Sequence, residues 1–324
     1  MSCLYLDQHG SHLGISGGQL TLKRLDGEER GYPLHQVERV VISGQVHLSA
    51  AAVGQLLYHG IPTLFCSSQG YLRGQLMPMN GGQVRRRARQ YALLNDEQTA
   101  FLLARSLVIA KLRNQQRVLV NWCCADKRLV KLSTHASRCD NMDRLRGFEG
   151  TAARLFFQAL AARLADTGFS FTGRAYHPAP DPVNSLLSFG YMLLVGELAV
   201  STESHRLDRY AGVYHVADGG QPSLLLDLME PLRPLVDRLV VKLLRDGVWN
   251  ADDFQHTGEE CRLRDGRRGC FLGAWESLMQ GQIHWRGEQT SYRRLIDLQV
   301  VEYIHVLEGK IDTPDWWTLD RDQT

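Results

Sequence analysis

The chain has 324 residues, of which 44% are hydrophobic and 22% are charged. This length supports a substantial buried core and favours two domains over one. Because 37 basic residues nearly balance 35 acidic ones, the formal net charge is only +2, and overall charge gives no argument for a nucleic-acid partner. Any basic binding surface must therefore be local.

Cysteine content and the N-terminal sequence bear on the compartment. The seven cysteines include no C-x-x-C pair, and an odd number cannot all pair within one chain. The first residues, MSCLYLDQHGSHLGISGG, lack a basic segment followed by an apolar one. No stretch approaches the roughly 20 uncharged apolar residues that a membrane-spanning helix needs. We therefore expect a reduced, cytoplasmic protein with no export signal and no membrane segment.

Short runs with alternating polarity predict β-strands from residue 1 to about 80. One helix is expected inside this region at SAAAVGQLLYHG, with Ser49 as its N-cap and Gly60 at its end. The predicted strands are CLYLD, HLGIS, QLTLKRL, VERVVIS and PTLFCS.

The periodicity changes after MPMNGGQVRRRARQY, residues 77–91, and becomes helical, which marks a domain boundary. We expect a β-rich domain over residues 1–90 and a mostly helical domain over residues 91–310. Residues 311–324 read as a loosely attached tail, whose paired tryptophans dock either on the body of the protein or on a partner. Helices are predicted within EQTAFLLARSLVIAKLRNQQRVLVNW, GFEGTAARLFFQALAARLA, NSLLSFGYMLLVGELAV and RPLVDRLVVKLL.

Acidic residues in apolar surroundings are the first candidates for a functional site. On a helix through FEGTAARLFFQALAARL, Glu149 shares the apolar face with Ala152, Ala153 and Phe156, so its carboxylate points inward. An unpaired buried carboxylate is too costly to keep ionised. We expect Glu149 to be neutralised, paired with a base, or bound to a metal.

The stretch PSLLLDLMEPLRP raises the same question for Asp227 and Glu230. If PSLLLDL is a buried strand or turn that leads into a helix with Pro231 in its first turn, Asp227 is the N-cap and Glu230 completes a capping box. Alternatively, Glu149, His215 and Glu230 form a ligand set for Mn²⁺ or Mg²⁺, and Asp227 binds a second ion, orients a water or holds the ligands. The residues alone leave both interpretations open.

Four motifs follow one another along the chain: GFEGTAARLFF, DPVNSLLSFGYMLL, LDRYAGVYH and SLLLDLMEPLRP. In this order they resemble the CRISPR-associated adaptation integrase/endonuclease family, the subunit that inserts new spacers into the repeat array. The resemblance extends through KLRNQ and SYRRLIDLQV to nearly the whole chain. It implies an α+β two-domain fold, in which an N-terminal β-sandwich-like domain precedes a mostly α-helical catalytic domain, and a homodimer.

The resemblance also implies roles for individual residues. It places the metal ligands on Glu149, His215 and Glu230, with Asp227 as a further catalytic position and Mn²⁺ or Mg²⁺ as cofactor. Arg233, within one turn of Glu230, is expected to neutralise a phosphate. Weaker substrate-binding candidates, which otherwise read as a helix cap, a core aromatic and a solvated basic face, are Asn184, Tyr191, Arg85, Arg86 and Arg87.

The function implied is a metal-dependent DNA endonuclease and integrase that inserts spacer DNA into a CRISPR array by phosphodiester transfer. The expected substrate is double-stranded or branched DNA, and the expected partner is a small ferredoxin-like subunit of the adaptation complex. The β-rich domain is expected to serve dimerisation and DNA contact. Two alternatives remain: a non-catalytic DNA-binding scaffold of the same fold, and a metal-dependent phosphohydrolase outside CRISPR adaptation.

Overall fold

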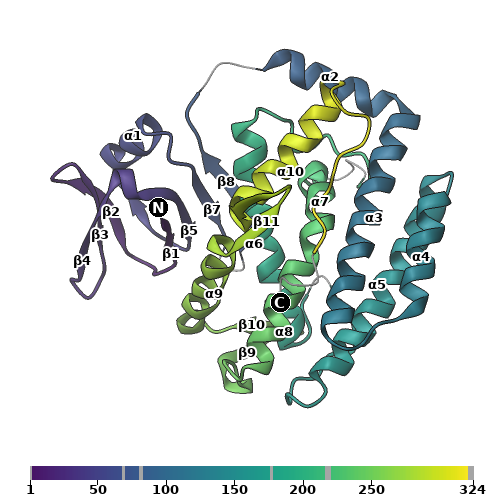
Figure 1. The fold of residues 1–324 in the computed structure, drawn as a ribbon. Helices are drawn as coiled ribbons and strands as arrows, with labels where there is room; N and C mark the ends of the chain where they lie inside the picture. The colour runs from purple at the N-terminus through teal and green to yellow at the C-terminus, as the bar shows by residue number, and fades with distance from the viewer. Residues whose placement is uncertain (1, 68–69, 80–82, 176–177, 216–219, 320–324) are drawn as a thin grey trace. The chain divides into compact units, whose positions relative to one another are not determined.

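The computed structural model divides the chain into two compact units, Met1–Gly82 and Gln83–Thr324. It describes residues 2–67, 70–79, 83–175, 178–215 and 220–319 (Figure 1). The first unit is rich in strands and the second is mostly helical, which confirms the predicted fold class. The arginine run at 85–89 follows the division and lies in the second unit. The roles in dimerisation and DNA contact remain predictions.

Two four-stranded sheets build the first unit (Figure 1). One has the order β1-β5-β7-β8, with β1, β5 and β7 mutually parallel and β8 antiparallel to β7. The other has the order β4-β3-β2-β6. The first consists of β1 (Ser2–Leu6), β5 (Val37–Ser43), β7 (Thr63–Cys66) and β8 (Leu72–Leu76), and the second of β4 (Glu29–Pro33), β3 (Gln19–Lys23), β2 (His12–Ser16) and β6 (His47–Leu48).

The core of this unit lies between the sheets and the helix α1 (Ala50–Tyr58). Ser49 caps α1 by accepting the Ala52 N–H at 3.1 Å, and Gly60 follows in the left-handed conformation, so both predicted helix ends are confirmed. Each predicted strand run overlaps an observed strand. Strands β4, β6 and β8 were missed because ERGYP, HL and LRGQL carry no clear alternation.

The second unit places nine α-helices among the residues described. Two short hairpins, which the sequence analysis did not predict, interrupt them: β9 (Phe254–Thr257) with β10 (Glu260–Leu263), and β11 (Gln282–Trp285) with β12 (Glu288–Ser291). The helices are α2 (Val84–Asn95), α3 (Glu97–Asn121), α4 (Lys127–Arg138), α5 (Met142–Leu164), α6 (Pro182–Ser204), α7 (Ser223–Met229), α8 (Arg233–Arg245), α9 (Arg268–Gln280) and α10 (Tyr292–Leu307).

Helix α6 is the core helix of this unit and packs against α7, α8 and α10. By length and composition alone it is apolar enough to cross a membrane, but 78% of its most apolar window is buried inside the protein. Asp181 caps its start and accepts the Asn184 N–H at 2.8 Å, so Asn184 lies in the first turn and is not the N-cap that we expected.

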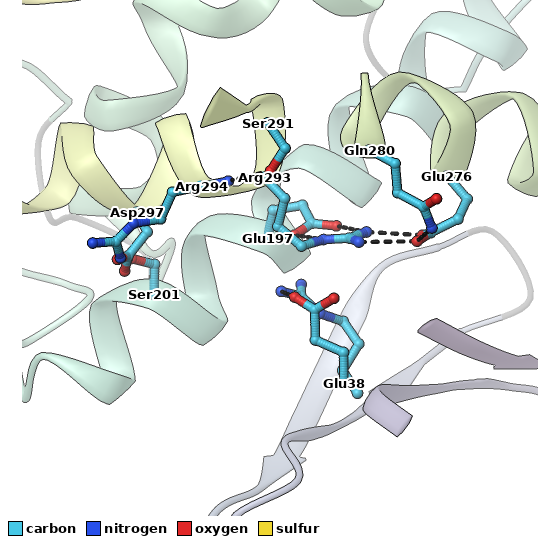
Figure 2. A network of polar contacts seen from close by, with 10 residues as sticks. Glu38, Glu197, Ser201, Glu276, Gln280, Ser291, Arg293, Arg294 and Asp297 are labelled. Atoms are coloured by element: carbon cyan, nitrogen blue, oxygen red, sulfur yellow. Dashed lines mark hydrogen bonds and ion pairs between the residues drawn. The ribbon is translucent and has the colours of Figure 1, made fainter. Parts of the chain in front are cut away.

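A buried ion network ties α6 to α9 and α10 (Figure 2). The guanidinium of Arg293 donates to both carboxylate oxygens of Glu197, at 3.1 and 3.2 Å, and to both oxygens of Glu276, at 2.8 and 2.9 Å. Two forked contacts on one arginine fix three helices in a single geometry. The network is therefore structural, and it lies outside the cavity described below.

Replacing Glu197 by alanine should lower the free energy of unfolding by about 3 kcal/mol, because the buried Arg293 guanidinium loses its forked contact with this carboxylate. Urea unfolding followed by circular dichroism measures the change. Arg294→Ala, next to Arg293 on α10, is the control, since its side chain is 60% exposed, and it should change the free energy by less than about 0.5 kcal/mol. Equal effects of the two variants would contradict the structural role.

Candidate active site

A cavity of about 370 Å³ gathers charged side chains from five parts of the helical unit. It brings together four residues singled out from the sequence: Glu149, His215, Glu230 and Arg233. Its lining comes from α3 (Lys111), α5 (Arg146 and Glu149), the segment 212–215 (Tyr214 and His215), the 3₁₀ turn η2, Glu230–Leu232 (Glu230), and α8 (Arg233).

Asp227 lies beside this cavity and holds the segment 212–215 in place. Its Oδ2 accepts the N–H groups of Val213 and Tyr214 at 2.5 and 3.0 Å, and its Oδ1 accepts the N–H of His215 at 2.9 Å. Gly212 makes room for this arrangement, since a Cβ there would lie 2.8 Å from the Asp227 carboxylate. The side chain thus supplies the hydrogen bonds that the irregular segment lacks.

The capping-box interpretation of this region was wrong. PSLLLDL forms the helix α7 rather than a strand or turn, and Asp227 lies inside this helix instead of at its start. Glu230 begins the following η2 turn and makes no side-chain cap. A short apolar run does not distinguish a buried strand from a buried helix, so periodicity alone could not settle the matter.

The same aspartate sets the state of the His215 ring. Its Oδ1 lies 2.8 Å from His215 Nδ1, and because a carboxylate oxygen only accepts, Nδ1 carries the hydrogen. In the neutral ring Nε2 is then left with its lone pair, and it lies 3.9 Å from Glu230 Oε1. A carboxylate behind an imidazole is the usual support for a metal-binding histidine.

Lys111 pairs with both glutamates of the cavity. Only 5% exposed on α3, it donates to Glu149 Oε1, and its ammonium also pairs with Glu230 Oε2. Burial by itself raises the pKa of Glu230, but Lys111, Arg233 and His215 together lower this pKa to about 2. Glu230 is therefore ionised although it is 1% exposed.

Sequence reasoning missed Lys111, Arg146 and Tyr214 as parts of the site. A signal existed for Lys111, because it shares the inward face of α3 with Leu107 and Val118. A lysine at such a position needs a carboxylate partner. Arg146 and Tyr214 carry no comparable signal, because their place depends on the contact between α5 and the segment 212–215, where Arg146 Nη2 donates to the Tyr214 carbonyl at 3.2 Å.

Two residues, Glu230 and Tyr191, hold the Arg233 side chain at the wall of the cavity. Its Nη1 donates to Glu230 Oε1 at 2.8 Å, and its guanidinium lies 4.5 Å from the centre of the Tyr191 ring. The Tyr191 hydroxyl in turn donates to the carboxylate of Asp237. Tyr191 therefore supports Arg233 and does not line the cavity itself.

The other weak candidates do not line the cavity. Asn184 is bonded to Arg174, Asp181 and neighbouring backbone. On α2, Arg86 donates to Glu308 and to the His205 carbonyl, Arg87 donates to the Arg206 carbonyl, and Arg85 is exposed. Contact of these arginines with DNA stays a prediction.

The donor set fits a hard divalent cation. Two carboxylates and an imidazole with a directed Nε2 are ligands that suit Mn²⁺ or Mg²⁺. Within the described part of the chain, no three His, Cys, Asp or Glu side chains converge at metal-ligand spacing. The cation between Glu149 and Glu230 is the Lys111 ammonium, so binding of an ion requires Lys111 to move aside.

Carboxylates and an imidazole that suit a divalent cation, next to guanidinium groups that suit a phosphate, are the components of a metal-dependent enzyme that acts on phosphate groups. The family model described as "CRISPR associated protein Cas1" matches residues 4–277. The chain therefore belongs to the Cas1 family, as the sequence motifs indicated.

Curated relatives agree with this assignment. The chain is 33% identical over 343 residues to a CRISPR-associated endonuclease Cas1 from Rhodospirillum rubrum, covering 98% of each. It is 33% identical over 297 residues to a Cas4 exonuclease/Cas1 endonuclease fusion from Geobacter sulfurreducens, covering 86% of the chain and 53% of the fusion. The chain thus spans about half the length of the fusion relatives that it matches.

Solved structures share the fold. A casposase bound to an integration product superimposes with a TM-score of 0.89 at 21% identity, covering 100% of this chain and 96% of the casposase. A CAS1 protein from Thermotoga maritima gives 0.85 at 23% identity, covering 98% and 100%. A chain of a Cas6-RT-Cas1–Cas2 complex gives 0.81 at 21% identity, covering 100% of this chain and 36% of that one.

Lys111→Met should reveal whether lysine and metal occupy the same place. Without the ammonium, Glu149 and the buried Glu230 repel each other, so we expect the metal-free protein to lose about 3 kcal/mol of stability. Mn²⁺ should then raise the melting temperature more in this variant than in the wild type. Lys131→Met, at an exposed position of α4, is the control. Equal stabilisation by Mn²⁺ in all three proteins would contradict a shared position.

Asp237 should make stability depend on pH. Burial raises its pKa to about 6, against the opposing effects of the Tyr191 hydrogen bond and Arg233. A carboxyl with a raised pKa binds its proton more tightly in the folded protein than in the unfolded one. Its contribution to the free energy of unfolding is therefore complete below pH 4 and is lost as the pH rises through 6. In the wild type this group should lower the free energy of unfolding by roughly 3 kcal/mol between pH 4 and pH 7, and Asp237→Asn should abolish that decrease. Parallel wild-type and variant stability curves, from urea unfolding at each pH, would contradict the assignment.

Proposed function

We propose that this protein is a metal-dependent DNA endonuclease and integrase that inserts spacer DNA into a CRISPR array by phosphodiester transfer. The observation that carries the proposal is the single cavity in which Glu149, His215 and Glu230 lie beside Arg146 and Arg233. Anionic ligands for a cation and guanidinium groups for a phosphate are the two requirements of phosphodiester chemistry.

Glu149, His215 and Glu230 would hold Mn²⁺ or Mg²⁺, which supplies a Lewis acid for the scissile phosphate when bound. Asp227 and Arg233 position the groups around this metal site. Asp227 orients His215 through Nδ1 and fixes the segment that carries it. Arg233, backed by the Tyr191 ring, presents positive charge where a phosphate oxygen would lie.

Arg146 supplies a second guanidinium at the rim. It is exposed, and one of its nitrogens is fixed by the Tyr214 carbonyl. Guanidinium groups pair with phosphate in a forked geometry, so the two arginines are suited to orient a DNA backbone across the cavity. Water as the nucleophile gives cleavage, and a DNA 3′-hydroxyl gives strand joining, with the same residues in use.

The proposal includes partners and location. We infer that the protein acts as a cytoplasmic homodimer on double-stranded or branched DNA, with a small ferredoxin-like subunit of the adaptation complex. The likeness in fold to the casposase and to the Cas1–Cas2 complex supports the substrate and the partner. Two of the curated relatives are fusions of a Cas4 exonuclease with a Cas1 endonuclease, and this chain covers 53% and 56% of their lengths.

Strand transfer tests the proposal. Purified protein is incubated with a branched duplex that has a free 3′-hydroxyl, with Mn²⁺ or with chelator. Glu149→Ala, His215→Ala and Glu230→Ala should each reduce joining at least 100-fold, because each removes a ligand, and should leave DNA binding within about twofold. Glu259→Ala, in an exposed turn, is the control and should retain activity.

Different outcomes separate the alternatives. Metal-independent DNA binding with no reaction by the wild type would indicate a scaffold. Hydrolysis of a small phosphate ester without action on DNA would indicate a general phosphohydrolase. Normal joining by any one of the three alanine variants would exclude that residue as a required ligand.

A further inference from the structure

The segment 311–319 is folded onto the helical unit, which resolves the choice between docking on the body and docking on a partner. Trp316, Trp317 and Leu319 are all buried. The Trp316 indole N–H donates to Ser106 Oγ on α3 at 2.8 Å, and the Trp317 N–H donates to Gln299 Oε1 on α10 at 2.7 Å. The segment therefore bridges α3 and α10.

One side chain joins this segment to the active site. The buried carboxamide of Asn114 donates to the Pro231 carbonyl at 2.7 Å and to the Trp317 carbonyl at 3.1 Å, and accepts the Leu319 N–H at 2.6 Å. Carbonyls only accept and an N–H only donates, so these partners fix the orientation of the carboxamide. Two of its three bonds come from the segment.

The third bond reaches the turn that carries Glu230. Pro231 and Pro234 stand in the first turns of η2 and α8 and have no N–H, so neither can donate a backbone hydrogen bond to hold the turn at Glu230. A turn with fewer internal bonds depends more on contacts from outside. Helix α3 supplies two such contacts, one turn apart: Lys111 to the Glu230 side chain, and Asn114 to the Pro231 carbonyl.

We propose that residues 313–319 are a positioning element of the active site. The peptide groups of Trp317 and Leu319 hold Asn114, Asn114 holds the Pro231 carbonyl, and this bond sets the place of the Glu230 carboxylate. Asn114 is thus a positioning residue that touches neither metal nor DNA. The effect on metal affinity rests on the proposed function, whereas the effect on the turn does not.

Two variants and one control test the series of contacts from the segment through Asn114 to Pro231. A chain that ends at Asp312 removes residues 313–319, the part of the segment named in the proposal. Asn114→Asp keeps the acceptor for Leu319 but loses both donated hydrogen bonds, and it carries the test if the shorter chain does not fold. Trp316→Phe is the control, because it loses the bond to Ser106 and leaves Asn114 untouched.

Two measurements give separate readouts: hydrogen exchange of the metal-free protein, and Mn²⁺ binding by calorimetry. Both are made at a temperature where circular dichroism shows all the proteins folded. In both variants, amides of residues 227–233 should exchange at least tenfold faster, and the Mn²⁺ dissociation constant should rise about tenfold, which is 1.4 kcal/mol. The control should match the wild type in both.

Unchanged exchange in both variants would overturn the positioning role, as would the same acceleration in Trp316→Phe. Faster exchange with an unchanged dissociation constant would overturn the link from Pro231 to Glu230. If the wild type itself binds no Mn²⁺ while the exchange difference is present, the metal site of the proposed function fails and the contact from the segment to the turn is upheld.

Discussion

The pairing of one buried lysine with two glutamates is the interaction on which the active site depends. Lys111 comes from α3, Glu149 from α5 and Glu230 from the turn before α8, so the ammonium links three segments that are far apart in the sequence. Without it, two negative charges would lie together where water has little access, at a cost that few folds tolerate. The same pairing lowers the pKa of Glu230, so that this buried carboxylate stays ionised and ready to bind a cation.

Around this pairing the protein arranges supports that do not themselves line the cavity. Asp227 replaces the missing regular hydrogen bonds of the segment before His215, and Tyr191 lies behind Arg233. Asn114 joins the turn at Pro231 to the folded segment 311–319. Ligands supported in this way are held in a defined geometry before substrate arrives, which is the condition for efficient electrostatic catalysis.

Most strands of the first unit, one helix and one site residue could be predicted from the sequence, because each depends on residues that are close together in the chain. Alternation predicted the main strands, Ser49 and Gly60 marked a helix, and a carboxylate on an apolar face singled out Glu149. The failures share a physical cause. The helix α7 was mistaken for a strand or turn because its apolar run is too short to show a period, and the partners of Asp227 lie outside its own helix. Lys111 and Asn114 act on residues more than 100 positions away, a distance that no local pattern reports.

The bonds of Asn114 also set an order of events during synthesis. Its partners Trp317 and Leu319 are separated from it by 203 and 205 positions, so a chain still on the ribosome cannot complete this contact until residues 317–319 have emerged. A nascent chain that stops before residue 317 therefore lacks two of the three hydrogen bonds of the Asn114 carboxamide, and with them the contact from this segment to the turn at Pro231.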